Sequence, residues 1–442
     1  MMSDRTLEKP SSSGYNPNGK IEIRGRTGFT KLPNELRIIT FQSDALKTMG
    51  IAFGVNYGSI HSLQKTDVIE TPHVLEHMMY QGTEYKESLE VLDCLEDFSV
   101  HNNAETLSES TIYHMSVNKE RETRERAVKL LAEIIMKPVI PQNRLPNTHD
   151  VVMAETKQRL DSIEDLLSVN VVKELFKDHA LLRKSRIPDE MEVYGISQEM
   201  LLAECKENYT AANSVLTLVG AMPHHKMVEL GERYFSEFNG KSDVRVIEPA
   251  STEHQYREAF MTNYKINSPT QSTIDVSLKL PHFGPGANPM EEAISGIARS
   301  ILYLRIFKSL REDAGLAYSP DVEEEKGSFF GMLSVTTKTN HDKINQAKDL
   351  IIKELASMSS GDITYEEFRT QQKREYIKAH VNSEDNLQIA TSIAALYLQH
   401  PDPFYWEESE KLIKKVSIDQ LREFCGTYLN PEKALVTMLV PR

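Results

Sequence analysis

An internal repeat constrains this chain more than any other feature of its sequence. Several features of the first half return in the second half at one common offset, among them Ser197 as Ser417 and Cys205 as Cys425. Two copies of one unit of about 220 residues are therefore predicted in the 442-residue chain. The matching segments are ISQEMLLAECKENY (196–209) with VSIDQLREFCGTYL (416–429), VLTLVG (215–220) with LVTMLV (435–440), and RAVKLLAEII (126–135) with QAKDLIIKEL (346–355).

Each copy carries strand patterns and helix patterns in the order of an α+β unit. Alternating apolar residues predict strands in IAFGVN (51–56), ESTIYHMSV (109–117), TIDVSLKL (273–280) and GMLSVTTK (331–338). Apolar residues three and four apart predict helices over residues 87–98, 123–137, 150–176 and 197–208. The predicted organisation is a flexible tail at 1–20, an α+β domain at 21–240, a linker at 241–256 and a homologous α+β domain at 257–442.

Composition excludes several classes of protein. The chain has 51 Lys and Arg against 65 Asp and Glu, a formal net charge of -14, which argues against a general nucleic-acid binder. No apolar run approaches the roughly 18 residues that span a bilayer, so we do not expect an integral membrane protein. Three cysteines are too few for a disulfide framework and indicate a reducing compartment. Residues 1–20 resemble neither a secretory signal nor an Arg-rich transit peptide.

The stretch His73-Val74-Leu75-Glu76-His77 is the most informative part of the sequence for chemistry. On a helix, His73 and His77 point from one face, where both can bind a single Zn²⁺ ion. Glu76 lies on nearly the same face and can act as a general base on a water molecule there. The pattern is the inverted zinc-protease motif H-x-x-E-H. The alternative interpretation is a pair of surface histidines beside an exposed Glu.

A hydrolytic zinc site needs a third protein ligand and an open position. The best candidate is Glu155, in the segment DVVMAETKQRLDS (150–162) on a predicted helix. A solvated helical Glu is the alternative, because sequence spacing alone does not select this residue. The neighbouring Asp161, Glu164 and Asp165 are interpreted as a solvated helix face.

The segment TPHVLEHMMYQGT (71–83) closely resembles the zinc helix of the pitrilysin and insulinase superfamily, with the beta subunit of the mitochondrial processing peptidase as its nearest likeness. The spacing from His77 to Glu155 fits that of the third ligand in this family. The resemblance implies that His73, His77 and Glu155 bind zinc and that Glu76 is catalytic.

The likeness extends over nearly the whole chain from about residue 25. HNNAETLSEST (101–111) looks like the edge-strand segment that aligns substrate in this family, which implies that Asn103 and Ala104 bind an extended peptide through backbone hydrogen bonds. Tyr80 matches an aromatic residue that receives the substrate residue after the cut. Packing on a neighbouring strand, or in the core for Tyr80, is the alternative role of these residues.

A second signature lies in the second half. RIFKSLREDAGLAYSP (305–320) resembles the Arg and Tyr segment of the family, and Arg311 and Tyr318 are then expected to donate hydrogen bonds to substrate carbonyls or to the oxyanion. A surface Arg and a half-buried Tyr are the structural alternative. The second copy has no H-x-x-E-H motif, so it is expected to be non-catalytic.

Two positions depart from the family pattern. Where the family often has a further Glu, seven residues before the third ligand, this chain has Thr148. Loss of such outer support can weaken metal binding or turnover by about 10–100-fold. Glu105 stands where the processing peptidases usually have an aromatic residue. FGPGANP (283–289) is a poor substitute for the long glycine-rich loop of their non-catalytic alpha subunit, which favours a catalytic chain.

The resemblance implies two homologous α+β domains that face one another across a cavity. The expected activity is zinc-dependent endoproteolysis that removes basic, extended amino-terminal targeting presequences from imported organellar precursors. The expected location is the matrix of a mitochondrion or a mitochondrion-related organelle, and a homologous partner subunit or a self-dimer is expected as well. The alternatives are a bacterial-type oligopeptidase of the same family, in a bacterial cytoplasm, and a non-proteolytic core subunit of a respiratory complex.

Overall fold

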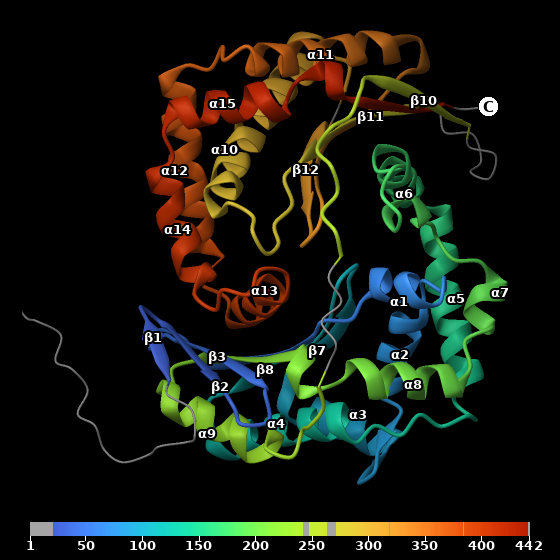
Figure 1. Ribbon diagram of the computed structural model, residues 1–442, viewed down its shortest axis with the longest axis vertical. Coiled ribbons are helices and arrows are strands. Elements are labelled where there is room, and N and C mark those ends of the chain that lie inside the picture. The colour runs from blue at the N-terminus through green and yellow to red at the C-terminus, as the bar shows by residue number, and fades with distance from the viewer. Residues whose placement is uncertain (1–20, 242–246, 263–270, 318, 383, 441–442) are drawn as a thin grey trace, which may run out of the picture.

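The computed structural model describes residues 21–241, 247–262, 271–317, 319–382 and 384–440. Their strands form a seven-stranded sheet in the first half of the chain and a five-stranded sheet in the second half, each covered by helices (Figure 1). The predicted α+β class is confirmed. No helix in the described part is long and apolar enough to cross a membrane.

The first sheet has the strand order β1-β2-β3-β9-β4-β8-β7, and a short β5-β6 pair lies apart from it. The strands are β1 Glu22–Arg24, β2 Thr27–Lys31, β3 Arg37–Gln42, β4 Thr48–Val55, β5 Gly82–Thr83, β6 Lys86–Glu87, β7 Ser99–Thr106, β8 Thr111–Asn118 and β9 Ser214–Gly220. The helices of this half are α1 Ser59–Lys65, α2 Thr71–Met79, α3 Ser88–Phe98, α4 Arg121–Met136, α5 Leu145–Asp161, α6 Ile163–Leu175, α7 Glu190–Tyr194, α8 Gln198–Asn208 and α9 His224–Phe235.

The second sheet has the order β10-β14-β11-β13-β12. Its strands are β10 Arg257–Thr262, β11 Ser272–Leu280, β12 Asp321–Lys326, β13 Gly331–Thr339 and β14 Leu435–Val440. The helices of this half are α10 Pro289–Ile306, continued by the π-helical segment η3 Phe307–Asp313, then α11 Ile344–Ser359, α12 Tyr365–Val381, α13 Asn386–Gln399, α14 Tyr405–Lys415 and α15 Ile418–Tyr428.

The two sheets repeat one another strand by strand. The order β3-β9-β4-β8-β7 in the first corresponds to β10-β14-β11-β13-β12 in the second. In each sheet the first of these pairings is parallel and the other three are antiparallel. The strands β8 and β13 begin at Thr111 and Gly331, which are separated by the same offset as Cys205 and Cys425. The internal repeat of the sequence is therefore a repeat of the fold.

One predicted helix is in fact two. The periodicity over residues 150–176 predicts a single helix, whereas the structure has α5 and α6 with a break at Ser162. Ser162 has extended backbone angles, and its side chain accepts a hydrogen bond from the Asp165 amide 3.1 Å away, as an N-terminal cap does. A change of helix direction at one capping serine leaves the apolar spacing almost unaltered, so periodicity alone could not locate it.

One helix of each half packs on the sheet of the other half. Apolar residues of α13 pack on β3, β4, β8 and β9 of the first sheet (Figure 1). Reciprocally, α6 packs on β11 and β14 of the second sheet. The residues of α13 buried in this contact are Ile389, Ala390, Ile393 and Ala394. Two apolar contacts, one made by α13 and one made by α6, therefore join the two halves.

The segment that follows residue 246 runs along the second half. The Ala250 amide donates to the Phe329 carbonyl at 2.7 Å, and the Tyr256 amide donates to the Glu432 carbonyl at 2.7 Å. Residues 242–246 of the predicted linker lie outside the described residues. Because α6 and α13 cross between the halves, we propose that the units at 21–240 and 257–442 fold as one cooperative body.

Replacing Ile393 with Ala should test that proposal. Ile393 is 2% exposed and belongs to the apolar contact between α13 and the first sheet. Removing its side chain is expected to lower the free energy of unfolding by about 2–5 kcal/mol, because a cavity remains behind. Urea unfolding followed by circular dichroism would measure the change. The exposed neighbour Gln388, replaced by Ala, is the control; equal stability of the two variants would contradict the proposal.

Candidate metal centre

The helix α2 presents its two faces to different surroundings. Glu70 is the residue at its N-terminal boundary, and Pro72 occupies the first turn, where a missing amide proton costs nothing. The apolar face, with Val74, Leu75, Met78 and Met79, is fully buried in the first core. This burial fixes the rotation of the helix and leaves the two histidines half-buried on the opposite side.

His73, His77 and Glu155 come together in space. The Nε2 atoms of His73 and His77 are 3.2 Å apart. Glu155 Oε2, on α5, lies 3.2 Å from Nε2 of His73 and 3.6 Å from Nε2 of His77. One ligand atom from each residue thus falls within 4.8 Å of the others. Two imidazole nitrogens and one carboxylate oxygen, with the Glu155 side chain 44% exposed, form an open three-ligand set of the kind that suits catalytic zinc.

Glu70 orients His73. Its Oε1 lies 2.6 Å from Nδ1 of His73, and its residue is only 4% exposed. A carboxylate on the far nitrogen fixes the tautomer and leaves Nε2 as the ligand atom. Thr148, the departure noted from the sequence, is buried and donates instead to Sδ of Met78 at 3.1 Å. Carboxylate support for the metal ligands is therefore present, but it comes from the start of α2 and not from α5.

The carboxylates around His73 change its acidity. Burial lowers the pKa of His73, but hydrogen bonds with Glu155 and Glu70 outweigh it and raise that pKa to about 10. The same hydrogen bond from His73 lowers the pKa of Glu155, against the effect of burial. A metal ligand must be unprotonated, so metal binding at neutral pH has to displace a proton from this pair. Protons and metal ions therefore compete for the same ligand atoms of this cluster.

Glu76 is held beside the cluster by an edge strand. It is 8% exposed, and its Oε2 accepts a hydrogen bond of 2.7 Å from Oγ1 of Thr106 at the end of β7. The other carboxylate oxygen, Oε1, takes no part in that bond. This arrangement holds a carboxylate one residue before His77 and in contact with the edge strand β7.

Three of the residues expected to bind substrate lie on α2 and β7. Ala104 is 8% exposed and packs in the first core, whereas Asn103 points from the opposite face of β7 and is exposed. β7 is the last strand of its sheet, as predicted. Tyr80 ends α2, packs partly against the first core and lies 5.9 Å from the ring of Tyr113. Tyr80 and Ala104 thus lie on α2 and β7, the two elements that Glu76 and Thr106 join, whereas Asn103 faces the other side of the sheet.

The segment 305–320, the second-half signature with Arg311 and Tyr318, lies on neither α2 nor β7. Arg311 is on η3, exposed, with its guanidinium 4.9 Å from the ring centroid of Phe307. Tyr318 lies outside the described residues. A role for either residue in binding substrate stays a prediction.

Glu70 and Thr106 contact residues of the candidate site, and the sequence did not single them out. Glu70 could have been found, since it stands three residues before His73 and an i, i+3 pair is adjacent on a helix. Thr106 could not, because its contact with Glu76 joins two segments through the tertiary fold. A threonine at the end of a strand has no distinguishing pattern.

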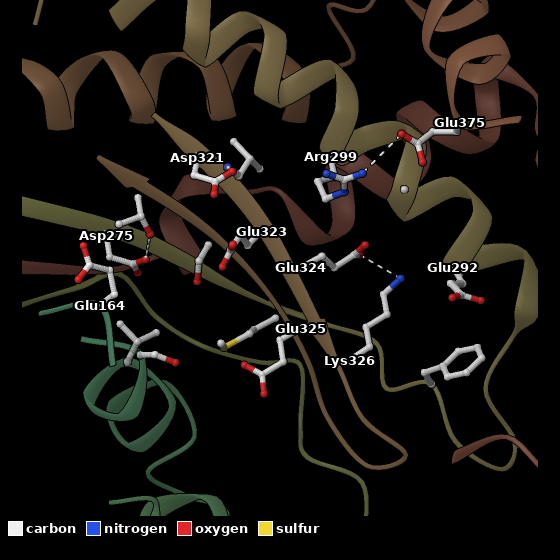
Figure 2. A pocket seen from close by; sticks show the side chains of 18 of the residues that line it. Glu164, Asp275, Glu292, Arg299, Asp321, Glu323, Glu324, Glu325, Lys326 and Glu375 are labelled. Carbon is white, nitrogen blue, oxygen red and sulfur yellow. Dashed lines mark hydrogen bonds and ion pairs between the residues drawn. The ribbon is translucent and has the colours of Figure 1, made fainter. Parts of the chain in front are cut away.

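The second copy has a cavity where the first has the metal ligands. A cavity of about 1390 Å³ lies beside β12, between α10, α12 and α6 (Figure 2). Glu375 of α12 occupies the position that the repeat offset assigns to Glu155, but its neighbours are Arg299, 3.4 Å away, and Ser300 of α10. Within the described part of the chain, the cluster of His73, His77 and Glu155 is the single group able to hold a metal ion.

The cavity is acidic. Arg299 pairs with Glu375 and Lys326 with Glu324, as the dashed lines of Figure 2 show. Burial raises the pKa of Asp275 to about 6 and that of Glu292 to about 7. Lining carboxylates that form no ion pair with a described residue are Asp275, Glu292, Asp321, Glu323 and Glu325.

Replacing Glu70 with Gln should weaken zinc binding by about 10–100-fold, because the charge that orients His73 is lost while the side chain keeps its size. Competition with a zinc-chelating dye would measure the affinity. Glu96, exposed on α3 and outside the cluster, replaced by Gln, is the matched control. Affinity equal to that of the control would show that Glu70 does not support the site.

Comparison with known proteins identifies two family models and several relatives by sequence. Residues 37–189 match the family model described as insulinase (peptidase family M16), and residues 195–375 match the model described as peptidase M16 inactive domain. An uncharacterized zinc protease of Rickettsia felis is 25% identical over 331 residues, which cover 74% of this chain and 76% of the relative. A probable beta subunit of the mitochondrial processing peptidase of Arabidopsis thaliana is 27% identical over 229 residues, 51% of this chain and 42% of that protein.

Solved structures share the fold at low identity. A peptidase M16 inactive domain from Pseudomonas fluorescens matches with a TM-score of 0.82 and 15% identity, covering 94% of this chain and 98% of that chain. The periplasmic protease PqqL of Escherichia coli matches with a TM-score of 0.76 and 14% identity, covering 94% of this chain and 48% of that chain. The fold of this chain thus corresponds to about half of PqqL.

Proposed function

Because this chain belongs to the insulinase family of peptidases, peptidase family M16, we propose that it is an active zinc endopeptidase in which His73, His77 and Glu155 hold the metal and Glu76 is the general base. Zinc is the cofactor of this family, and relatives of this chain are named zinc proteases. The observation that carries the proposal is the convergence of the three ligand atoms within 4.8 Å, with Glu76 beside them on α2.

The donor set fits zinc well. Two imidazole nitrogens and one carboxylate leave a fourth position open, and Glu70 supplies the outer hydrogen bond that such histidines need. Zinc, when bound, polarises the substrate carbonyl and acidifies a water molecule. Glu76 would accept a proton from water as the water oxygen adds to the substrate carbonyl carbon, and would return it to the amide nitrogen as the C–N bond breaks. Thr106 holds Oε2 of Glu76, which leaves Oε1 for the water.

An extended peptide fits the free edge of β7. The sheet ends at this strand, so the outward amide and carbonyl groups of β7 can pair with a substrate backbone. Thr106, at the end of β7, contacts Glu76 directly, which brings a peptide bond on this edge within reach of the general base. Asn103 and Ala104 are the central positions of this pairing.

For the substrate we favour a broad range of peptides, degraded by an oligopeptidase of bacterial type. The relative from Rickettsia felis is similar over three quarters of both chains, whereas the similarity to the processing-peptidase beta subunit spans about half of each. The location that we propose for such an oligopeptidase is a bacterial cytoplasm. The complete ligand set argues against a non-proteolytic core subunit, which needs neither a metal nor Glu76.

Removal of basic presequences in a mitochondrion-related organelle is the second candidate. The acidic cavity beside β12 supports it, because carboxylates without cationic partners suit a positively charged peptide. Since the fold corresponds to about half of PqqL, we also propose that a homologous partner subunit or a second copy of this chain completes the enzyme.

The test is a digest by the purified chain with zinc, read by mass spectrometry, on one basic targeting peptide and a panel of unrelated peptides. Scattered cuts that the Glu76→Gln variant does not make would support the peptide-degrading enzyme. One cut near a basic residue, also dependent on Glu76, would favour presequence removal. Zinc bound without any cut, even after addition of a homologous partner chain, would refute the proposed activity.

A further inference from the structure

The edge strand β7 presents different side chains to its two sides. Ala104 packs in the first core with α2, and Thr106 reaches Glu76. Glu105, between them, points from the other face, because successive side chains of a strand alternate. That face is the one covered further along the sheet by α13: Ile112, which pairs with Glu105 in the register, packs against α13. Glu105 is therefore next to the catalytic region but on the opposite side of the strand.

His114 is the neighbour of Glu105 on this face. It pairs with Asn103 in the register of β7 and β8, so it lies diagonally across from Glu105. Its Nε2 is 3.6 Å from Oε1 of Glu105, too far for a hydrogen bond. His114 is 8% exposed, and neither ring nitrogen has a hydrogen-bond partner within the described part of the chain. A buried polar ring without partners is costly, and here it borders a free carboxylate.

The carboxylate of Glu105 is exposed and forms no ion pair with a described Lys or Arg side chain. Its side chain is 58% exposed, and within the described residues His114 is its one ionic neighbour. Burial outweighs the attraction of Glu105 and lowers the pKa of His114, so at neutral pH the ring does not neutralise Glu105. An exposed, uncompensated carboxylate at the open edge of a sheet attracts a cationic group.

We propose that Glu105 is a subsite for the Lys or Arg side chain of a substrate residue adjacent to the cleaved bond. The inference rests on the proposed function and deepens it. A peptide strand paired with β7 turns alternate side chains towards α2, beside Ala104 and Tyr80, and towards Glu105. Directly opposed side chains on neighbouring strands have Cβ atoms about 4.5–5.5 Å apart, within reach of a long cationic side chain.

The pairing selects a two-residue pattern in the substrate. One residue faces the partly buried Tyr80, which suits an apolar or aromatic side chain. The residue next to it faces Glu105 and suits a cation. A charge-assisted hydrogen bond in this partly exposed position corresponds to about a tenfold preference for Lys over Glu.

The experiment compares peptides that differ at one position, scanned with Lys and Glu around the cleaved bond, as substrates of the wild-type chain and of Glu105→Lys. The wild type is expected to prefer Lys about tenfold in kcat/KM at one position beside the cut. Glu105→Lys should reverse that preference while cleavage stays dependent on Glu76. Glu96→Lys, which makes the same charge change on exposed α3, should leave it unaltered.

An unchanged Lys-to-Glu ratio in Glu105→Lys, with cleavage retained, would overturn the subsite. Binding of the same peptides to zinc-loaded Glu76→Gln, measured by fluorescence anisotropy, separates this failure from a failure of the proposed function. If the wild type cleaves nothing, a tenfold binding preference lost on combining Glu76→Gln with Glu105→Lys would still support the subsite, and equal binding would overturn it.

Discussion

Replacing Glu76 with Gln is expected to lower kcat/KM for a cleaved peptide by about 10²–10⁴-fold, the range that a positioned general base contributes. The amide keeps the size of the side chain and can still accept the hydrogen bond from Thr106 Oγ1. It cannot take a proton from water. Initial rates of cleavage by the wild type and the variant, at equal zinc content, would measure the loss.

Zinc content decides how that loss is interpreted. Glu76 is not among the three ligands, so Glu76→Gln should bind one zinc per chain as the wild type does. A variant that lost both zinc and activity would mean that Glu76 holds the metal. A variant with unchanged activity would mean that the base lies elsewhere, which would contradict the site proposed for this chain.

Replacing His77 with Ala should remove zinc and cleavage together. One of three protein ligands is lost, and two ligands from His73 and Glu155 cannot hold a hydrolytic zinc ion in an open site. His77 is half-buried on the polar side of α2, so the fold is expected to persist. Zinc content by atomic absorption after dialysis, together with the circular dichroism spectrum, would test both expectations.

The matched control is His225→Ala, an exposed histidine at the start of α9. It should keep zinc and activity at wild-type levels. Full zinc binding by His77→Ala would show that the ligands are not those named here, and loss of the folded spectrum would mean that His77 is a structural residue.

Local patterns were sufficient for the repeat, the main strands and two of the three ligand candidates. His73 and His77 lie on one helical face by spacing alone, and β4, β8, β11 and β13 follow the alternation of apolar residues. Glu155 needed more, because nothing in single-sequence spacing separates it from other helical glutamates; the family resemblance selected it. The structure then placed its carboxylate 3.2 Å from His73.

What escaped prediction depends on contacts between distant segments. The exchange of α6 and α13 between the halves is invisible in periodicity, since each helix has an apolar face whichever sheet it covers. Thr106 contacts Glu76 because β7 passes beside α2 in the folded chain. The sequence shows Thr148 where the family often has a supporting Glu, and Glu70, three residues before His73, could have been considered as its replacement.

A crystal structure of the Glu76→Gln variant with zinc and a basic peptide tests the account most directly, with data collected at the zinc absorption edge. We expect one anomalous peak about 2.0–2.2 Å from Nε2 of His73, Nε2 of His77 and a carboxylate oxygen of Glu155. We also expect the peptide to extend the first sheet beyond β7. An anomalous peak elsewhere, or its absence at saturating zinc, would contradict the proposed metal centre, and a peptide bound away from β7 would contradict the proposed mode of substrate binding.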